Sequence, residues 1–575
     1  MRRRNSIQGF MLAAVLLAAA GSSQSNFTLS VLPPTMRIGP ETPAVGAASA
    51  DIACARGEWE SFQVVVAATG QRLEDADASI SALTSADGKS LGKDNTILYR
   101  EVLIPVRHSV PRAACPPGLV PDALVPFVNP YTGEKIFEPK WREERRSGVR
   151  FGAAGFEVWP GQCQVLWVDV YVPPDTPAGF YEGALTVTAN GEQSAEIPVR
   201  LTVWDFVLPA GPAHENHFGG FGSLRNYHQL GEDTAAYERL EERYIEMMAA
   251  NRINPPVPAR LLPPVAEDGT AQFDEALEQR WTEFVEKHHV TNIQVPMAPF
   301  GDALGQDRAK ALQFYRSWFA YLEKKGWAAR ASLYMLDEPN DPEAYERVRQ
   351  LGALVHEAEP RLRRLVVEQP YTQDPVWGTL DGSIDIWCPL FGFVHEGSVQ
   401  RVKANGNAVW SYTALVQSAP PYHPEYETVK NDNPPYWQLD FPVTAYRIAP
   451  WLNRRYGITG LLYWATVYWD SPARNPWHDP GFRIRWNGEG ALFYPGDDAG
   501  IEGPVASIRL KNLRDGMEDY EYFALLEQRG GQALVEDIVH SAVPTWGAWD
   551  QDPYRLLELR RQLATAIVDR AMGAN

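Results

Sequence analysis

Residues 331–359 read ASLYMLDEPNDPEAYERVRQLGALVHEAE and predict a β-strand followed by an α-helix. The apolar run 331–336 leads into two adjacent carboxylates and a proline, and Asp341 with Pro342 then supplies a helix N-cap and a first-turn proline. From Asp341 to Glu359 the apolar residues recur at helical spacing. The stretch therefore predicts one βα unit, and the sequence on both sides of it repeats the pattern.

Strand candidates alternate with helix candidates over about 300 residues. The expected helices include 234–250, 274–288, 307–325 and 341–359, and helical sequence returns at 507–571. The expected strands are 217–222, 256–261, 292–297, 331–336, 365–368, 384–388, 409–412 and 461–465. This count predicts a (β/α)8 barrel of the TIM type. An open doubly wound sheet is the alternative, but no glycine-rich phosphate turn follows the first strand.

A different pattern precedes the Pro- and Gly-rich segment 208–212. Short alternating runs such as 61–67 and 164–172, separated by Pro- and Gly-rich turns, predict an antiparallel β-sandwich. Before them, three arginines precede an apolar run at 10–20, as in a signal peptide. We expect a signal peptide at 1–25, a β-sandwich at 26–207, a catalytic barrel at 212–530 and a C-terminal helical segment at 531–575 packed on the barrel.

Charge and hydropathy limit the partners. A formal net charge of −19 leaves no basic surface for nucleic acid or an anionic membrane. The expected signal peptide predicts export to the periplasm or the extracellular space, and no later segment has the apolar length of a membrane span. In that oxidising setting Cys54, Cys115 and Cys163 could form a disulfide, although their spacing selects no pair, and Cys388 is expected to be a buried thiol. No CxxC motif occurs, and we expect neither a metal nor a cofactor.

Candidate functional residues lie where a barrel places its active site, at the C-terminal ends of the strands. Asp337 and Glu338 directly follow the fourth strand; both can reach one pocket only where the pleat relaxes, which Pro339 favours. A solvated pair before the next helix is the alternative. Aromatic residues, which suit stacking on sugar faces, are expected to bind substrate at the other strand ends. They are Tyr371, Trp387, Tyr412, Trp464, Tyr468 and Trp469, each of which could equally belong to the core.

Three further segments carry polar side chains. The loops 477–479 (WHD) and 486–489 (WNGE) could add contacts to substrate. The acidic residues Glu518, Asp519 and Glu521 are expected on a solvated helix face. Carboxylates and aromatic rings in one pocket describe a glycosidase.

The C-terminal part of the chain resembles a known family. The segments 460–465 (GLLYWA), 490–496 (GALFYPG), 503–510 (GPVASIRL) and 513–521 (LRDGMEDYE) resemble the signature of the domain of unknown function 4091. That group includes the β-N-acetylgalactosaminidases of glycoside hydrolase family 123. The resemblance covers the expected barrel and the sandwich before it.

The resemblance implies a catalytic role for Asp337 and Glu338. In the implied mechanism the substrate's 2-acetamido oxygen attacks C1 and forms an oxazolinium ion, with retention of configuration. Glu338 would protonate the leaving oxygen and later deprotonate water, while Asp337 would accept the acetamido N–H and stabilise the positive charge. Tyr371 or Tyr412 could orient the acetamido carbonyl, and Trp464 could form the floor beneath the sugar.

We therefore expect an exported, exo-acting, retaining glycosidase similar to β-N-acetylgalactosaminidases, acting on a glycan or glycoconjugate. One alternative is a glycosidase on another β-glycoside that uses a protein nucleophile, for which Glu368 and Asp470 are candidates. Another alternative is a carbohydrate-binding protein without catalysis. The sugar, the linkage and the oligomeric state do not follow from the sequence.

Overall fold

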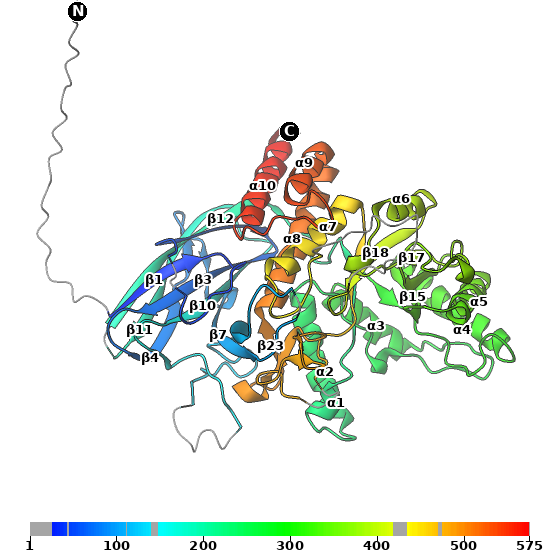
Figure 1. Cartoon of the computed structure of the whole chain (residues 1–575), viewed down its shortest axis with the longest axis horizontal. Helices are drawn as coiled ribbons and strands as arrows, with labels where there is room; N and C mark the ends of the chain where they lie inside the picture. The colour runs from blue at the N-terminus through cyan, green and yellow to red at the C-terminus, as the bar shows by residue number, and fades with distance from the viewer. Residues whose placement is uncertain are drawn as a thin grey trace, which may run out of the picture.

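The computed structural model describes residues 26–42, 45–110, 112–139, 148–191, 193–417, 434–469 and 474–573. The predicted signal peptide at 1–25 and the candidate nucleophile Asp470 lie outside these described residues. In Figure 1 the N-terminal sheets, blue and cyan, occupy one side of the molecule, and a parallel sheet, green to yellow, occupies the other. The C-terminal helices, orange and red, lie between the two parts.

Two seven-stranded sheets form the N-terminal part of the fold. In spatial order the first contains β1 (Phe27–Leu32), β3 (Glu58–Ala68), β10 (Cys163–Val172), β7 (Thr96–Val106), β8 (Gly118–Pro126), β23 (Pro504–Ser507) and β22 (Phe493–Pro495). The second contains β2 (Ala50–Arg56), β12 (Gln193–Val207), β11 (Gly179–Ala189), β4 (Leu73–Ile80) and β9 (Phe156–Val158), with β5 (Leu83–Ser85) and β6 (Ser90–Leu91) beside β11. Every strand pair in these sheets is antiparallel except β2 with β12.

The two N-terminal sheets share a core built from alternating residues of their central strands. Val64 and Leu166 of the first sheet and Leu185 and Leu201 of the second belong to one buried cluster. The predicted antiparallel N-terminal sheets are thus confirmed. Strands β22 and β23 follow the parallel sheet in the sequence, so residues near the C-terminus complete the first sheet.

The parallel sheet has seven strands, not the eight that the sequence predicts. In spatial order they are β13 (Glu215–Phe218), β19 (Gly460–Tyr463), β18 (Ala408–Thr413), β17 (Ile386–Trp387), β16 (Arg363–Val367), β15 (Ala331–Asp337) and β14 (Ile293–Gln294). The predicted second strand at 256–261 is absent from the sheet, and residues 259–261 form a 3-10 turn instead. The curled parallel sheet is therefore open between its edge strands β13 and β14.

Two prolines account for the missing strand. Pro255 and Pro256 have no N–H to donate to a ladder, so this segment cannot pair in full with either neighbour. Asn254 bridges the gap instead: its N–H donates to Asn216 Oδ1 at 2.7 Å and its Nδ2 donates to Asn292 O at 2.8 Å. The complete (β/α)8 barrel is not confirmed, but amide side chains join the two edges where its second strand would lie.

Helices follow most strands of the curled sheet. They are α1 (Leu224–Tyr227), α2 (Thr234–Ala250), α3 (Glu275–Lys287), α4 (Arg308–Lys324), α5 (Pro342–Ala358), α6 (Glu396–Ala404) and α7 (Thr444–Tyr456). Asp274 and Asp341 cap α3 and α5 by accepting backbone N–H groups, as their sequence positions predict. Strand β16 is the exception, because only a 3-10 turn, η5 (Pro375–Trp377), lies between it and β17.

Helix α8 (Ile508–Gln528) joins the two parts of the molecule, and it corrects one expectation. Glu518, Asp519 and Glu521 are not solvated but 1%, 0% and 1% exposed. Asp519 accepts two hydrogen bonds from Arg447 of α7, at 2.8 and 2.9 Å. Charged residues lie inside here because their partners come from distant parts of the chain, which spacing within one helix does not reveal.

The same helix is paired with the sandwich. Arg514 and Lys511 contact Asp169 of β10 at 3.1 and 2.9 Å. Burial alone would raise the pKa of Asp169, but these two cations outweigh it and lower that pKa below its usual range. Gly516 allows α7 and α8 to approach, since a Cβ there would lie 2.5 Å from Arg447 O. The signature at 513–521 is therefore an interface between the two parts of the fold.

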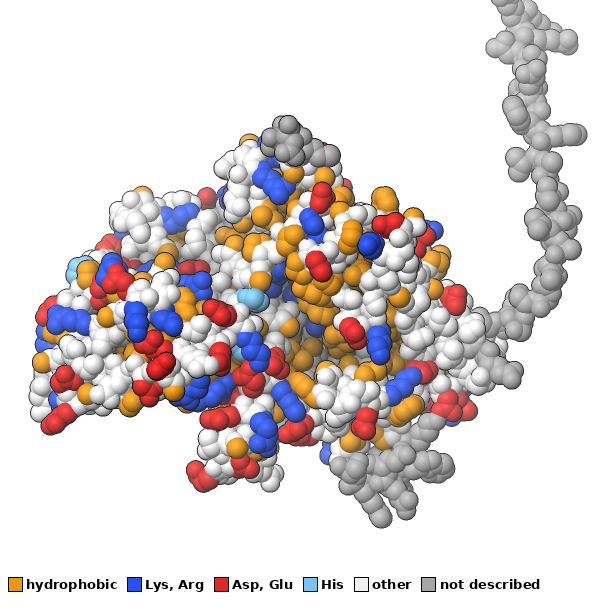
Figure 2. All heavy atoms as spheres, turned by 180° about the vertical axis from the view of Figure 1, so that it is seen from behind, with side chains coloured by type: hydrophobic (Ala, Val, Ile, Leu, Met, Phe, Trp, Pro, Cys, Tyr) orange, Lys and Arg blue, Asp and Glu red, His pale blue; other side chains and the backbone are white. Residues whose placement is uncertain are grey.

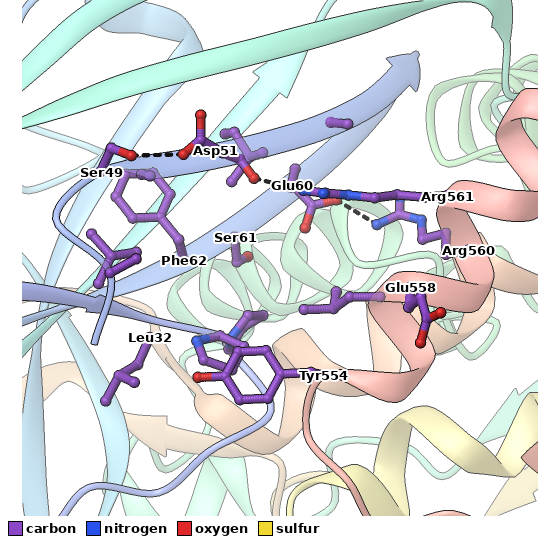
Figure 3. A pocket seen from close by; sticks show the side chains of 18 of the residues that line it. Leu32, Ser49, Asp51, Glu60, Ser61, Phe62, Tyr554, Glu558, Arg560 and Arg561 are labelled. Carbon is purple, nitrogen blue, oxygen red and sulfur yellow. Dashed lines mark hydrogen bonds and ion pairs between the residues drawn. The ribbon is translucent and has the colours of Figure 1, made fainter. Parts of the chain in front are cut away.

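The C-terminal helices α9 (Gln532–Ala542) and α10 (Arg555–Gly573) complete this interface. Helix α10 packs on α8, on α9 and on β12 of the sandwich. A cavity of about 410 Å³ lies between α10 and the sandwich, and Figure 3 shows Arg560 reaching Glu60 at its inner end, with Tyr554 and Phe62 along its sides. All of its lining residues come from the sandwich and the C-terminal helix, so it is separate from the carboxylates at the end of β15.

Cysteines and surface charge complete the description. All four cysteines are free, and Cys54 and Cys388 are buried. On the face shown in Figure 2, basic and acidic side chains are interspersed, and apolar side chains gather along its middle. Within the described ranges, no helix is both long and apolar enough to cross a membrane.

Candidate active site

Two consecutive carboxylates lie where β15 leaves the curled sheet. Asp337 is the last residue of β15, and Glu338 follows it; both side chains are exposed. The ladder to β16 shifts register between Tyr334 and Leu336, and Glu338 has a φ of 41°. A positive φ is rare for glutamate, and such strain gathers at functional sites. The pleat is therefore already broken here, which allows neighbouring side chains to face the same opening.

Each carboxylate is held by a tyrosine from the inner face of the sheet. Tyr334 donates its hydroxyl to Asp337 Oδ1 at 2.8 Å, and Tyr412 of β18 donates its hydroxyl to Glu338 Oε1. Burial, with the adjacent carboxylate charges, raises the pKa of both tyrosines, so both remain hydrogen-bond donors. The ring of His217 lies 6.2 Å from that of Tyr334, and burial lowers the pKa of His217 to about 4. The imidazole beside Tyr334 is therefore neutral near pH 7.

A cavity of about 260 Å³ opens beside Glu338; we call it the catalytic cavity. It is lined by Glu338, Pro339, Asn340, Val367, Glu368, Gln369, Gln373, Cys388, Leu390, Phe393, Tyr412 and Gln417. Its apolar and aromatic residues come from the loop after β15, from β16, from the segment after β17 and from β18, and the amides come from loops. This mixture of apolar surface and a few polar groups suits a small polar ligand.

Glu368 is a second carboxylate in the catalytic cavity. Tyr345 of α5 donates to its Oε1 at 2.9 Å, and Gln369 also donates to it. The side chain is only 4% exposed, and burial, together with the charge of Glu338, raises its pKa well above the usual range. The neutral form of Glu368 is therefore favoured.

Aromatic rings border the site beside β19. Trp464 and Tyr468 are partly exposed, with ring centroids 4.8 Å apart. Phe482 of the hairpin β20 (Gly481–Phe482) and β21 (Trp486–Asn487) packs on both, at 5.9 and 5.5 Å. These three rings offer an apolar surface next to the end of β18, where Tyr412 lies.

Glu489 holds the Trp464 ring of this aromatic surface in place. The side chain is fully buried and accepts from Trp464 Nε1 at 2.6 Å, from Leu415 N at 3.1 Å and from Gln438 Nε2. Gly490 leaves room for the indole, because a Cβ there would lie 2.5 Å from the Trp464 ring. One carboxylate thus sets the position of Trp464 and of the loop that carries Gln417 into the catalytic cavity.

Three of the predicted aromatic residues lie elsewhere. Trp469 is fully buried and packs on Tyr227 with ring centroids 5.1 Å apart, so it is a core residue. Trp387 lies on the outer face of β17, because its neighbours Ile386 and Cys388 belong to the inner cluster. Trp387 and Tyr371 line a separate cavity. The structure thus brings Asp337, Glu338 and Tyr412 together, with Trp464 and Tyr468 at the border.

The two predicted polar loops differ in their contribution. Trp477 is buried in the sandwich core and donates to Pro495 O at 2.9 Å, while His478 contacts Arg150. That loop therefore supports the sandwich and does not reach the catalytic cavity. In the loop 486–489, Glu489 contributes as the support of Trp464.

Some residues of the site escaped sequence reasoning. Tyr334 could have been found from the sequence, because it lies in the same strand as Asp337 and a tyrosine just before a carboxylate at a strand end can donate a hydrogen bond to it. His217 and Gln417 gave no such signal, because only the folded sheet brings them near. Among the described residues, no group of three or more His, Cys, Asp or Glu side chains is placed to hold a metal ion.

Comparison with known proteins identifies a matching family. The family model of the glycoside hydrolase 123 catalytic domain matches residues 308–526, a segment that contains the carboxylate pair, Tyr412 and Trp464. A search of curated proteins found no match.

One solved structure shows the same fold. A family 123 glycoside hydrolase from Clostridium perfringens, described in a study of glycolipid glycan hydrolysis, has a TM-score of 0.66 at 13% identity, over 96% of this chain and 99% of that chain. A Bacteroides ovatus GH5 xyloglucanase has a TM-score of 0.28 at 10% identity, over 85% of this chain and 100% of that one. A family 39 glycoside hydrolase from Bacteroides cellulosilyticus WH2 has a TM-score of 0.31 at 12% identity, over 76% and 80%. Only the first of these likenesses is strong enough to describe the fold.

Proposed function

We propose, on the premise that this chain is a glycoside hydrolase with a family 123 catalytic domain at 308–526, that it hydrolyses a terminal β-linked 2-acetamido sugar by substrate assistance. The sugar that we propose is N-acetylgalactosamine at the non-reducing end of a glycan. The observation that carries the proposal is the adjacent pair Asp337 and Glu338, each oriented by its own tyrosine at one opening.

The proposed reaction assigns one role to each carboxylate. The substrate's acetamido oxygen attacks C1 as the bond from C1 to the leaving oxygen breaks, and Glu338 gives its proton to that oxygen. Asp337 accepts a hydrogen bond from the acetamido N–H and stabilises the positive charge of the oxazolinium ion. Water then adds to C1 and loses a proton to Glu338, and the ring opens to restore the acetamido group. Two displacements at C1 retain the configuration.

The surroundings of the pair support these roles. Tyr412 donates to Glu338 from the catalytic cavity, and the partly exposed ring of Trp464 provides an apolar surface for the C–H face of a sugar. A protein nucleophile is the alternative, and Glu368 is the described carboxylate nearest to that role. Burial and the charge of Glu338 raise its pKa, although the bond from Tyr345 lowers it, and a raised pKa favours the neutral acid, which is a poor nucleophile.

Two mechanism-based probes separate the routes. A thiazoline derived from N-acetylgalactosamine mimics the bicyclic oxazolinium ion, and it should inhibit the enzyme competitively and far more tightly than the free sugar. A 2-fluoro glycoside with an activated leaving group has no acetamido group and traps a protein nucleophile as a covalent adduct. We expect no mass increase with the fluoro sugar. An adduct on Glu368, with no inhibition by the thiazoline, would overturn substrate assistance.

We also propose that the enzyme is exported and acts on glycoconjugates outside the cytoplasm. The arginines and apolar run within 1–25 support export, and the similar Clostridium perfringens enzyme, described for glycolipid glycan hydrolysis, supports a glycoconjugate substrate. Mass spectrometry of the protein recovered from its source should find a chain that lacks the first 25 or so residues. Recovery of the full-length chain from the cytoplasm would contradict export.

A further inference from the structure

The cavity of about 410 Å³ between helix α10 and the sandwich is a site that glycoside hydrolysis does not use; we call it the sandwich cavity. Its walls come from β1 and β3 at one edge of the first sheet and from β2 and β12 at one edge of the second. Helix α10 covers the gap between these edges. No residue lines both this cavity and the catalytic cavity, and its volume falls within the range of small-ligand sites.

Apolar side chains form most of the wall of the sandwich cavity. Leu32, Ile52 and Phe62 come from the sandwich, and Leu557 comes from α10. Tyr554 also lines the cavity and is 53% exposed, so it lies at the mouth. Figure 3 shows Phe62 and Tyr554 along the sides of the open space. Such a wall suits the apolar part of a small ligand.

Glu60 supplies an unpaired acceptor at the inner end of the cavity. The residue is 4% exposed; its Oε2 accepts from Arg560 Nη1, whereas its Oε1 has no hydrogen-bond partner among the described residues. Figure 3 shows the carboxylate between Arg560 and the open space. A carboxylate oxygen that is withdrawn from bulk water and lacks a partner is costly, and a ligand donor would satisfy it.

The charges around Glu60 leave a negative surplus. Among the described residues, connected ion pairs join six buried carboxylates to five buried cations. The carboxylates are Glu58, Glu60, Asp169, Asp515, Glu518 and Asp519, and the cations are Arg252, Arg447, Lys511, Arg514 and Arg560. Burial, followed by the charge of Asp515, raises the pKa of Glu60 well above its usual range. An ammonium group beside Oε1 would balance the surplus in place of a proton.

Arg561 brings an unpaired cation to the same cavity. Its Nη2 donates to Asp51 O at 2.7 Å, and it forms an ion pair with no carboxylate of the described residues. The acidic residues of the rim have other partners, since Asp51 pairs with Arg200 at 3.4 Å and Glu558 pairs with Arg555 at 2.8 Å. Arg561 directly follows the arginine that holds Glu60, so the free cation and the free carboxylate oxygen belong to the same part of the cavity.

We propose that the sandwich cavity binds a free α-amino acid with an apolar side chain. The ammonium group donates to Glu60 Oε1, the carboxylate pairs with Arg561, and the side chain packs on Phe62 and Leu557. A sugar would leave most of its hydroxyl groups against the apolar wall, and a fatty acid would leave the oxygen of Glu60 unpaired. This binding goes beyond the proposed hydrolysis of glycosides and does not depend on it.

Three ligands of one shape test the charge pattern by calorimetric titration of the full chain. L-Phenylalanine carries both charges, 2-phenylethylamine lacks the carboxylate, and 3-phenylpropanoate lacks the ammonium group. We expect 3-phenylpropanoate to bind about 10- to 100-fold more weakly than L-phenylalanine, because it loses a hydrogen bond to a charged acceptor. For 2-phenylethylamine we expect a loss of about twofold to fivefold, because Arg561 is exposed. No binding of L-phenylalanine, or equal binding of either analogue, would overturn the site.

Glu60→Gln tests the partner of the ammonium group. It should weaken the binding of L-phenylalanine and 2-phenylethylamine about 10- to 100-fold and should not weaken that of 3-phenylpropanoate. Glu58→Gln is the matched control, because Glu58 is buried in the same strand and also contacts Arg560 but does not line the cavity. Equal losses in the two variants, or no loss in Glu60→Gln, would overturn the site.

Arg561→Gln tests the partner of the carboxylate and disturbs no buried group, because Arg561 is exposed. It should weaken the binding of L-phenylalanine and 3-phenylpropanoate about twofold to fivefold and leave that of 2-phenylethylamine unchanged. Arg570→Gln is the matched control, because Arg570 is exposed in the same helix and does not line the cavity. Wild-type binding of all three ligands by Arg561→Gln, or the same loss in Arg570→Gln, would contradict the proposal.

Discussion

Replacing Glu489 with glutamine tests how the aromatic border of the site is held. The carboxylate accepts on both oxygens: Trp464 donates to one at 2.6 Å, and Leu415 N, at 3.1 Å, and Gln438 donate to the other. Glutamine keeps the shape but has only one acceptor oxygen. Its NH2 group must face at least one of these buried donors and leave it unpaired.

The magnitude follows from that count of donors. Abandoning one buried donor costs about 1–3 kcal/mol, and the amide will turn to the side where the fewest bonds are lost. That side is the single bond to Trp464, so we expect the free energy of unfolding to fall by about 1–3 kcal/mol. We also expect the released indole to raise KM for an aryl N-acetyl-β-galactosaminide, with a smaller effect on kcat.

Urea unfolding followed by circular dichroism measures the stability, and initial rates give KM and kcat. Glu521→Gln is the matched control, because Glu521 is also buried but accepts one bond, from Ala213 N at 2.6 Å, which a glutamine oxygen can still accept. A Glu489→Gln enzyme with wild-type KM, whatever its stability, would refute the inference that this carboxylate positions Trp464 for substrate.

Three further predictions concern the active site, pH and the interface. Tyr412→Phe should lower kcat/KM about 10- to 100-fold, the value of a hydrogen bond to a charged group, while far-UV circular dichroism shows the same fold; activity within twofold of wild type would contradict the role of this hydroxyl. Burial raises the pKa of Glu101 to about 8, whereas an unfolded glutamate ionises near about 4.3. The stability that Glu101 contributes is therefore complete below pH ~4 and is lost as pH rises through about 8. The free energy of unfolding of the wild type should fall by up to about 1.4 kcal/mol per pH unit in this range, and Glu101→Gln should remove that fall. Equal slopes for the two proteins in urea titrations between about pH 5 and 8 would speak against it. Arg514→Met leaves Asp169 short of a buried partner and should cost about 3–5 kcal/mol in urea unfolding, and a loss under about 1 kcal/mol would show that Lys511 alone suffices.

The sequence predicted those helices and strands whose caps and apolar periodicity lie within the element itself. Helix α5 begins where Asp341 and Pro342 place it, and the strand before it ends at the carboxylate pair, because caps and apolar periodicity are read within a few residues. The prediction of the second strand failed because prolines stand before and within its apolar run. Pro255 and Pro256 lack the N–H groups that a ladder requires, and apolar character alone did not show this.

The site was predictable in part. Asp337 and Glu338 stood out because strand ends face the opening of a curled sheet, but Trp387 could not be assigned to a face until Ile386 and Cys388 were seen on the inside. Burial of Glu518 was also beyond the sequence, since its partner Arg252 lies far away in the chain. Long-range pairing, not composition, decides whether such charges are inside.

The most direct test of substrate-assisted catalysis by the carboxylate pair is the release of aryl alcohol from aryl β-glycosides of N-acetylgalactosamine, N-acetylglucosamine, galactose and glucose, by the wild type, Glu338→Gln and Asp337→Asn. We predict turnover confined to an acetamido sugar and reduced about 100-fold or more by either substitution. Turnover of the galactoside or the glucoside at a comparable rate, or full activity of Glu338→Gln, would contradict it.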